Sequence, residues 1–70
     1  MVEQEVKRIT EWASKVDENN TRPMTANNIL RAVKRVDCTW RERLEIARGV
    51  ARQMFIVPEQ IFEGYIERLR

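Results

Sequence analysis

The chain has 70 residues, of which 43% are hydrophobic and 34% charged, and its formal net charge is +2 at pH 7. The apolar content is too high for a disordered chain, and the length fits one small domain, here residues 1–70. The chain has no histidine and one cysteine, which excludes a histidine general base, a zinc cluster and an intramolecular disulfide. We therefore expect a non-enzymatic domain without a metal or cofactor.

The lengths of the apolar segments indicate where the protein is located. No uncharged apolar run approaches the roughly 18 residues that span a bilayer, and residues 1–15 lack the apolar core of a signal peptide. The sequence therefore predicts a cytoplasmic protein that does not bind membranes.

Apolar residues near the N-terminus recur every three or four positions, as they do on one face of an amphipathic helix. This pattern predicts a helix over residues 2–16, followed by an exposed polar connection of about eight residues that contains Pro23. The predicted buried stripe consists of Val2, Val6, Ile9, Trp12, Ala13 and Val16.

The second predicted helix spans residues 26–36, with Thr25 as its N-cap. One side is apolar, whereas the other side carries amides and bases without any acidic residue. The apolar side consists of Ala26, Ile29, Leu30, Ala32, Val33 and Val36. The polar side consists of Asn27, Asn28, Arg31, Lys34 and Arg35.

A capping box, TWRE, predicts the start of a third helix over residues 40–55, because Thr39 and Glu42 can each accept a hydrogen bond from the other's backbone N–H. Its predicted buried side consists of Trp40, Leu44, Ala47, Val50, Ala51, Met54 and Phe55. Two residues do not fit this pattern. Arg43 points into the apolar arc and Ile46 out of it, so we expect one to find a polar partner and the other to meet a neighbouring helix.

Pro58 suits the first position of a fourth helix, predicted over residues 58–69. Its predicted buried face consists of Ile61, Phe62, Tyr65, Ile66 and Leu69. Gly49 and Gly64 lie inside the third and fourth helices, where we expect them to allow close helix packing. No segment sustains strand alternation, so the predicted fold is a compact all-α domain of four short helices, the later connections having about three and two residues.

The local charge is uneven, and residues 19–36 contain four basic residues and no acidic one. Arginine can read guanine and asparagine can read adenine, while other basic side chains contact phosphates. This block predicts binding of duplex DNA by a small regulatory protein, although a basic stretch can also be a solvated helix face. The candidate nucleic-acid-binding residues are Arg22, Asn27, Asn28, Arg31, Lys34 and Arg35.

A short segment also resembles a known family. Residues 51–64 read AxxMxIxPExIxxG, through Ala51, Met54, Ile56, Pro58, Glu59, Ile61 and Gly64. This is similar to the end of a lambda-repressor-like helix-turn-helix domain. The resemblance implies that helix 26–36, with Asn27, Asn28 and Arg31, holds the place of the recognition helix. Upstream, this chain has a polar connection without glycine where the family has a glycine-containing tight turn.

An alternative hypothesis is a protein-binding adaptor or inhibitor, since a small domain with several aromatic residues encloses few side chains completely. Apolar surface left exposed would mark a partner groove or a homodimer contact. The candidate residues are Phe55, Ile56, Phe62, Tyr65 and Ile66. The same residues could equally form the core.

Catalysis finds no support in the remaining chemistry. Cys38 precedes a predicted helix N-terminus, where the dipole can lower a thiol pKa, but no histidine is present to activate it. The carboxylates fall on polar faces or helix ends, which gives no paired acid and base. We therefore expect Cys38 to be a structural or incidental thiol.

Overall fold

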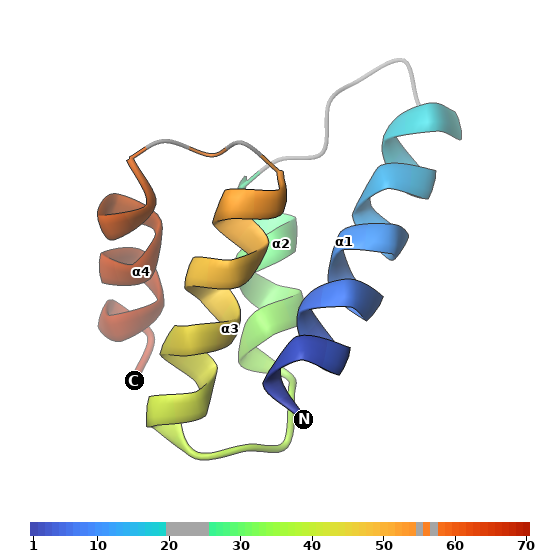
Figure 1. Cartoon of the computed structure of the whole chain (residues 1–70). Helices are drawn as coiled ribbons and strands as arrows, with labels where there is room; N and C mark the ends of the chain where they lie inside the picture. Colours follow the sequence, from blue (N-terminus) through green and yellow to red (C-terminus); the bar gives the residue numbers. More distant parts are fainter. Residues whose placement is uncertain (20–25, 55, 57) are drawn as a thin grey trace.

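The computed structural model, shown in Figure 1, describes residues 1–19, 26–54, 56 and 58–70. It contains α1 (Val2–Asn19), α2 (Ala26–Lys34), α3 (Trp40–Gln53) and α4 (Glu59–Arg68). The described ranges contain no strand. The predicted all-α fold of four short helices is therefore confirmed. None of these helices is both long enough and apolar enough to cross a membrane.

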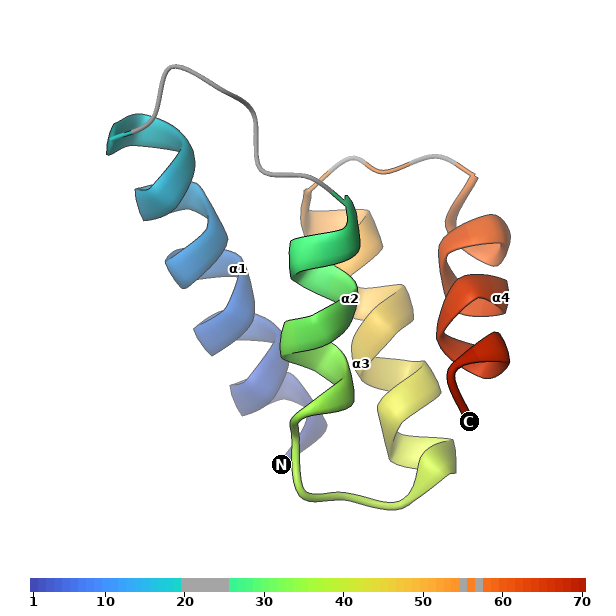
Figure 2. The ribbon, with the colours of Figure 1, turned by 180° about the vertical axis from the view of Figure 1, so that it is seen from behind.

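The helices α2 and α3 form the middle of the domain, and each contacts all three other helices. The helices α1 and α4 lie on opposite sides of this pair and make no contact with each other in the described chain. Figure 1 shows α3 in front of α2, and Figure 2, from behind, shows α2 in front. One side of α2 therefore packs inward while the other faces solvent.

All four helices contribute to one hydrophobic core. Its buried residues are Ile9, Ala13, Ile29, Leu30, Val33, Val36, Ile46, Ala47, Val50, Ala51, Phe62 and Ile66. The prediction for α1 was wrong at Trp12, which is 42% exposed, although Ile9 and Ala13 of the same stripe are fully buried. The stripe is wider than the surface that α2 and α3 cover, because α4 lies on the far side of the domain.

The two helical glycines differ in what surrounds them. A Cβ atom added to Gly49 would lie 2.7 Å from Cγ2 of Val6, so the close approach predicted there is confirmed for α1 and α3. A Cβ atom added to Gly64 would meet nothing within 4 Å, so the same prediction was wrong for α4. Helix packing therefore does not require glycine at position 64.

The capping box at the start of α3 is confirmed. The backbone N–H of Glu42 donates to Oγ1 of Thr39 at 3.2 Å, and the backbone N–H of Thr39 donates to Oε1 of Glu42 at 3.1 Å. The backbone and side-chain hydrogen bonds from Thr39 lower the pKa of Glu42 below its ordinary value of 4.5. The cap thus fixes where the central helix begins and favours the ionised carboxylate.

Arg43, predicted to seek a polar partner, joins α3 to the end of α2 and is only 9% exposed. Its Nη1 atom donates to the backbone oxygen of Val33 at 2.8 Å and to that of Lys34, while Nη2 donates to Cys38 O at 3.4 Å. The oxygens of Val33 and Lys34 belong to the last turn of α2, and that of Val33 also accepts from the backbone N–H of Val36 at 3.2 Å. The guanidinium therefore adds hydrogen-bond donors at the helix C-terminus. Ile46, the other misfit, is fully buried in the core.

The helix boundaries differ from the prediction by a few residues. The helix α1 extends to Asn19 rather than ending at residue 16. The helix α2 ends at Lys34 rather than at residue 36, and Arg43 donates a hydrogen bond to the backbone oxygen of this last residue. Residues 35–39 therefore form a longer connection than the predicted three residues. Pro58 is the N-cap of α4, with extended backbone, rather than its first helical residue. The predicted N-cap Thr25 lies outside the described residues.

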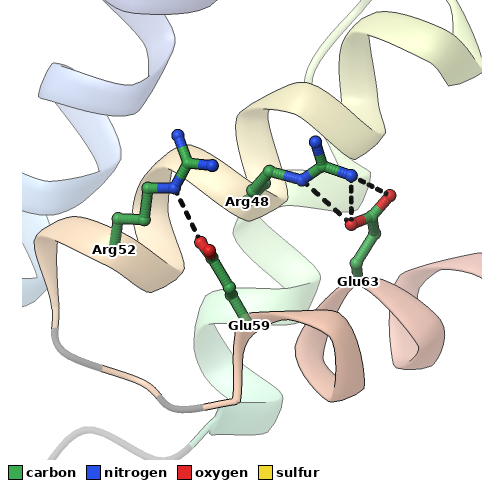
Figure 3. A network of polar contacts seen from close by, with 4 residues as sticks. All are labelled: Arg48, Arg52, Glu59 and Glu63. Atoms are coloured by element: carbon green, nitrogen blue, oxygen red, sulfur yellow. Dashed lines mark hydrogen bonds and ion pairs between the residues drawn. The ribbon is translucent and has the colours of Figure 1, made fainter.

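Two ion pairs join α3 to α4 (Figure 3). The Nη2 atom of Arg48 lies 2.9 Å from Oε2 of Glu63, and the Nε atom of Arg52 lies 2.8 Å from Oε2 of Glu59. Both arginines are largely exposed, so each pair contributes a modest stabilisation. Their charges are neutralised on the side of α4 that faces α3.

Candidate nucleic-acid interface on α2

Three exposed cations lie on the solvent-facing side of α2 and at the residue that directly follows it: Arg31, Lys34 and Arg35. Within the described part of the chain, no carboxylate lies within ion-pair distance of any of them. Four arginines on the other helices and at the C-terminus do have such partners. These pairs are Arg8–Glu5, Arg48–Glu63, Arg52–Glu59 and Arg70–Glu67.

Helical spacing explains why the three cations share a face. Positions 34 and 35 follow position 31 by three and four residues, and the backbone N–H of Arg35 donates to the oxygen of Arg31 at 3.1 Å, which continues the helical turn past Lys34. The three side chains therefore project from the same side. Ile29 and Val33 project from the other side and are buried at 2% and 0% exposure. The aliphatic side fixes α2 against the core, and the cationic side is left to solvent.

The other predicted nucleic-acid-binding residues are placed less completely. Asn28 is exposed on α2 next to the cations. Arg22 and the side chain of Asn27 lie outside the described residues. The structure therefore brings together Asn28, Arg31, Lys34 and Arg35 of the predicted set.

A groove of about 560 Å³ borders this surface, between α2 and α4. The residues that line it are Leu30, Arg31, Tyr65, Arg68 and Leu69. The guanidinium of Arg68 lies over the ring of Tyr65, 5.8 Å from its centroid. Sequence analysis missed Arg68 as a neighbour of the cationic surface, because only the packing of α2 against α4 brings it there.

The predicted protein-binding surface requires correction. Phe62 and Ile66 are 2% and 0% exposed, so they belong to the core and cannot contact a partner in this fold. Ile56 is half-buried against the core, and Phe55 lies outside the described residues. Of the predicted set, Tyr65 alone is exposed in the described chain, at 43%. The reason is that α3 and α2 cover the part of α4 that carries Phe62 and Ile66.

The exposed apolar surface of α4 is formed by other residues. Ile61 and Leu69 are 52% and 40% exposed and lie four positions on either side of Tyr65. One turn thus separates each residue from the next, which places all three along one strip. The prediction that this whole face is buried was therefore wrong at these three residues, because the neighbouring helices cover only the part of α4 that carries Phe62 and Ile66.

Two further observations concern the cysteine and the metal-ligating side chains of the described residues. Burial raises the pKa of the half-buried Cys38 thiol above its ordinary value of 9.0, which disfavours the reactive thiolate. No group of three or more His, Cys, Asp or Glu side chains within the described ranges is placed to hold a metal ion. A second groove, of about 670 Å³ between α1 and α3, is lined by charges of both signs, including Glu3, Lys7 and Arg52.

Comparisons of this chain with protein-family models, with curated proteins and with solved structures found no match. The resemblance of residues 51–64 to a lambda-repressor-like domain therefore stays a prediction from the sequence.

Proposed function

We propose that this chain is a small non-enzymatic regulatory protein that binds duplex DNA through the exposed side of α2. The observation that carries the proposal is the set of three exposed cations, Arg31, Lys34 and Arg35, with no carboxylate partner in the described chain. Such a set gives a local positive potential even though the net charge of the whole chain is only +2.

A buried arginine, Arg43, already offsets the negative end of the α2 dipole, so this role does not fall to the exposed cations alone. Basic side chains in the last turn of a helix often offset the negative end of its dipole. In α2 the Arg43 guanidinium already donates directly to the carbonyls of Val33 and Lys34. The charges of Arg31 and Arg35 are therefore available to an external anion.

Each of these cations would contact one phosphate group. Neutralising about three phosphates gives a slope of roughly −2.7 for the logarithm of the binding constant against the logarithm of salt concentration. Binding is thus expected to be modest and to weaken steeply with salt. Asn28 and Arg31, on the same helix, have the side-chain chemistry that recognises base edges.

The test is fluorescence anisotropy of a labelled duplex titrated with the chain at low salt. We expect the double variant Arg31→Glu, Arg35→Glu to lose binding. The matched control is Lys7→Glu with Arg41→Glu, which changes the net charge equally, at exposed positions on α1 and α3. The control should retain most of the binding.

Two results contradict the proposal. Absence of binding by the unsubstituted chain at low salt would reject DNA binding altogether. An equal loss in the two double variants would show that net charge, rather than the α2 surface, determines the affinity. Thermal melts of both variants establish that each remains folded.

A further inference from the structure

DNA binding leaves the apolar strip on α4 unexplained. Ile61, Tyr65 and Leu69 are 52%, 43% and 40% exposed and recur every four residues along one helix. Isolated exposed apolar residues are common on proteins, whereas a continuous strip next to a groove is typical of a binding surface. A phosphate backbone offers nothing apolar to cover it.

The strip continues into the groove between α2 and α4, which lie side by side in Figure 2. Leu30, at 6% exposure, reaches the groove from α2, and Tyr65 and Leu69 line it from α4. The volume of about 560 Å³ is enough for several side chains of a partner. The apolar lining favours an occupant with aliphatic or aromatic side chains.

Cations border this apolar lining on both helices. Arg31 lines the groove from α2 and Arg68 from α4, and both are exposed. Neither has a carboxylate within ion-pair distance among the described residues. The contact of Arg68 with the ring of Tyr65 keeps this charge beside the apolar surface.

Charge decides between the two simplest occupants. In a symmetric homodimer formed through this surface, each groove would face its own copy, which would bring the Arg31 and Arg68 side chains of both chains together. Like charges at close range oppose such a contact. A partner that presents carboxylates beside apolar side chains would instead complement both features of the groove.

We propose that the groove between α2 and α4 binds an acidic amphipathic helix of a protein partner. Apolar residues of that helix, spaced three and four apart, pack on Leu30, Tyr65 and Leu69. Carboxylates that flank these residues pair with Arg31 and Arg68. This proposal goes beyond DNA binding, because it rests on the apolar groove rather than on Lys34 and Arg35.

The probe is a synthetic helical peptide with leucines at spacings of three and four and glutamates on its remaining surface. A matched peptide carries lysines in place of the glutamates. Two-dimensional NMR of the isotope-labelled chain locates the binding site. We expect the acidic peptide to shift the amide resonances of the groove residues and to bind about tenfold more tightly than the lysine peptide.

Two variants test the two parts of the groove separately. Tyr65→Ala should weaken binding of the acidic peptide about tenfold or more, because it removes the largest exposed apolar contact. Arg68→Glu should reverse the preference, so that the lysine peptide binds more tightly than the acidic one. The matched control Arg41→Glu lies on exposed α3 surface outside the groove and should change neither affinity. If Tyr65→Ala lowers the helicity of the chain, the reversed peptide preference of Arg68→Glu still tests the proposed groove.

Three outcomes overturn the proposal. The first is that neither peptide shifts the groove resonances, and the second is that both peptides bind equally well. The third is that these resonances shift on dilution of the chain alone, which would identify a second copy as the occupant. The variant Arg35→Glu separates the two proposals, since it should weaken DNA binding and leave peptide binding intact. Tyr65→Ala should do the reverse.

Discussion

The helix α4 borders two different regions: the contact with α3, here called the seam and formed by Phe62, Glu63 and Ile66, and the groove between α2 and α4. The two regions differ in how far their side chains are buried and paired. At the seam, Phe62 and Ile66 are buried, and Glu63 is paired with Arg48. At the groove, Tyr65 is 43% exposed, and Arg68 has no carboxylate partner in the described chain. One helix therefore packs into the core on one side and leaves apolar and cationic side chains exposed on the other.

The largest expected effect contrasts buried and exposed apolar residues of α4. Phe62→Ala should destabilise the domain by about 3 to 5 kcal/mol, because it leaves a cavity in the core. Ile61→Ala, at a residue that is 52% exposed, should change the free energy of unfolding by less than about 1 kcal/mol. Urea unfolding followed by circular dichroism measures both values. Equal losses would mean that the two sides of α4 do not differ in this way.

The two glycines extend the comparison to the helix backbone. Gly49→Ala places a methyl group against Val6, and overpacking of about 1 to 3 kcal/mol should exceed the gain of about 1 kcal/mol in helix propensity. Gly64→Ala meets no neighbour and should stabilise the domain by about 0.5 to 1 kcal/mol. Melting temperatures should therefore move in opposite directions. A stabilising Gly49→Ala would show that α1 can move away from α3 at little cost.

Substitution of an arginine in the seam and of one in the groove should change the free energy of unfolding by smaller amounts. Arg48→Ala removes the ion pair with Glu63 and should cost about 0.2 to 1 kcal/mol. Arg68→Ala removes no ion pair among the described residues, only the exposed contact with the ring of Tyr65, and should cost no more than the loss at Arg48. Unfolding curves at low and high salt distinguish the two, because salt weakens only the loss at Arg48. A larger loss for Arg68→Ala would contradict the assignment of that residue to binding.

The smallest effect concerns the cap of α3, the helix on which both regions depend. The hydrogen bonds from Thr39 lower the pKa of Glu42 in the folded chain below 4.5, so its carboxylate stabilises the fold above that pH. This stabilisation should be lost as the pH falls below 4.5 through the folded-state pKa. Glu42→Gln keeps an acceptor without the titration, and its stability should therefore depend less steeply on pH in the acid range. Parallel pH curves for the two chains would contradict the role of the charge.

Much of the fold could be predicted from the sequence, because its main features are local. The capping box at Thr39 and the apolar periodicity of α3 depend only on neighbours along the chain. Arg43 and Ile46, which break that periodicity, could be recognised as unusual. Their actual neighbours, the end of α2 and the core, became evident only when the helices were packed together.

The candidate site could be predicted only in part, for the same physical reason. The exposed side of α2, with Arg31 and Arg35, follows from helical spacing alone. The groove does not, because it is lined by Leu30 and Leu69, which are far apart in the sequence and meet only when α2 packs against α4. Periodicity also cannot show how much of an apolar face is covered, so it left open whether Phe62 lies at a binding surface or in the core, where the structure places it.

The way in which Arg43 holds α2 bears on how this domain can change during evolution. The guanidinium bonds to main-chain oxygens, at residues 33, 34 and 38, and every amino acid has such an oxygen. Substitutions among the outward-facing residues of α2 therefore leave this anchor intact. The exposed side of α2 can therefore change its charge and chemistry over evolution while the helix keeps its position.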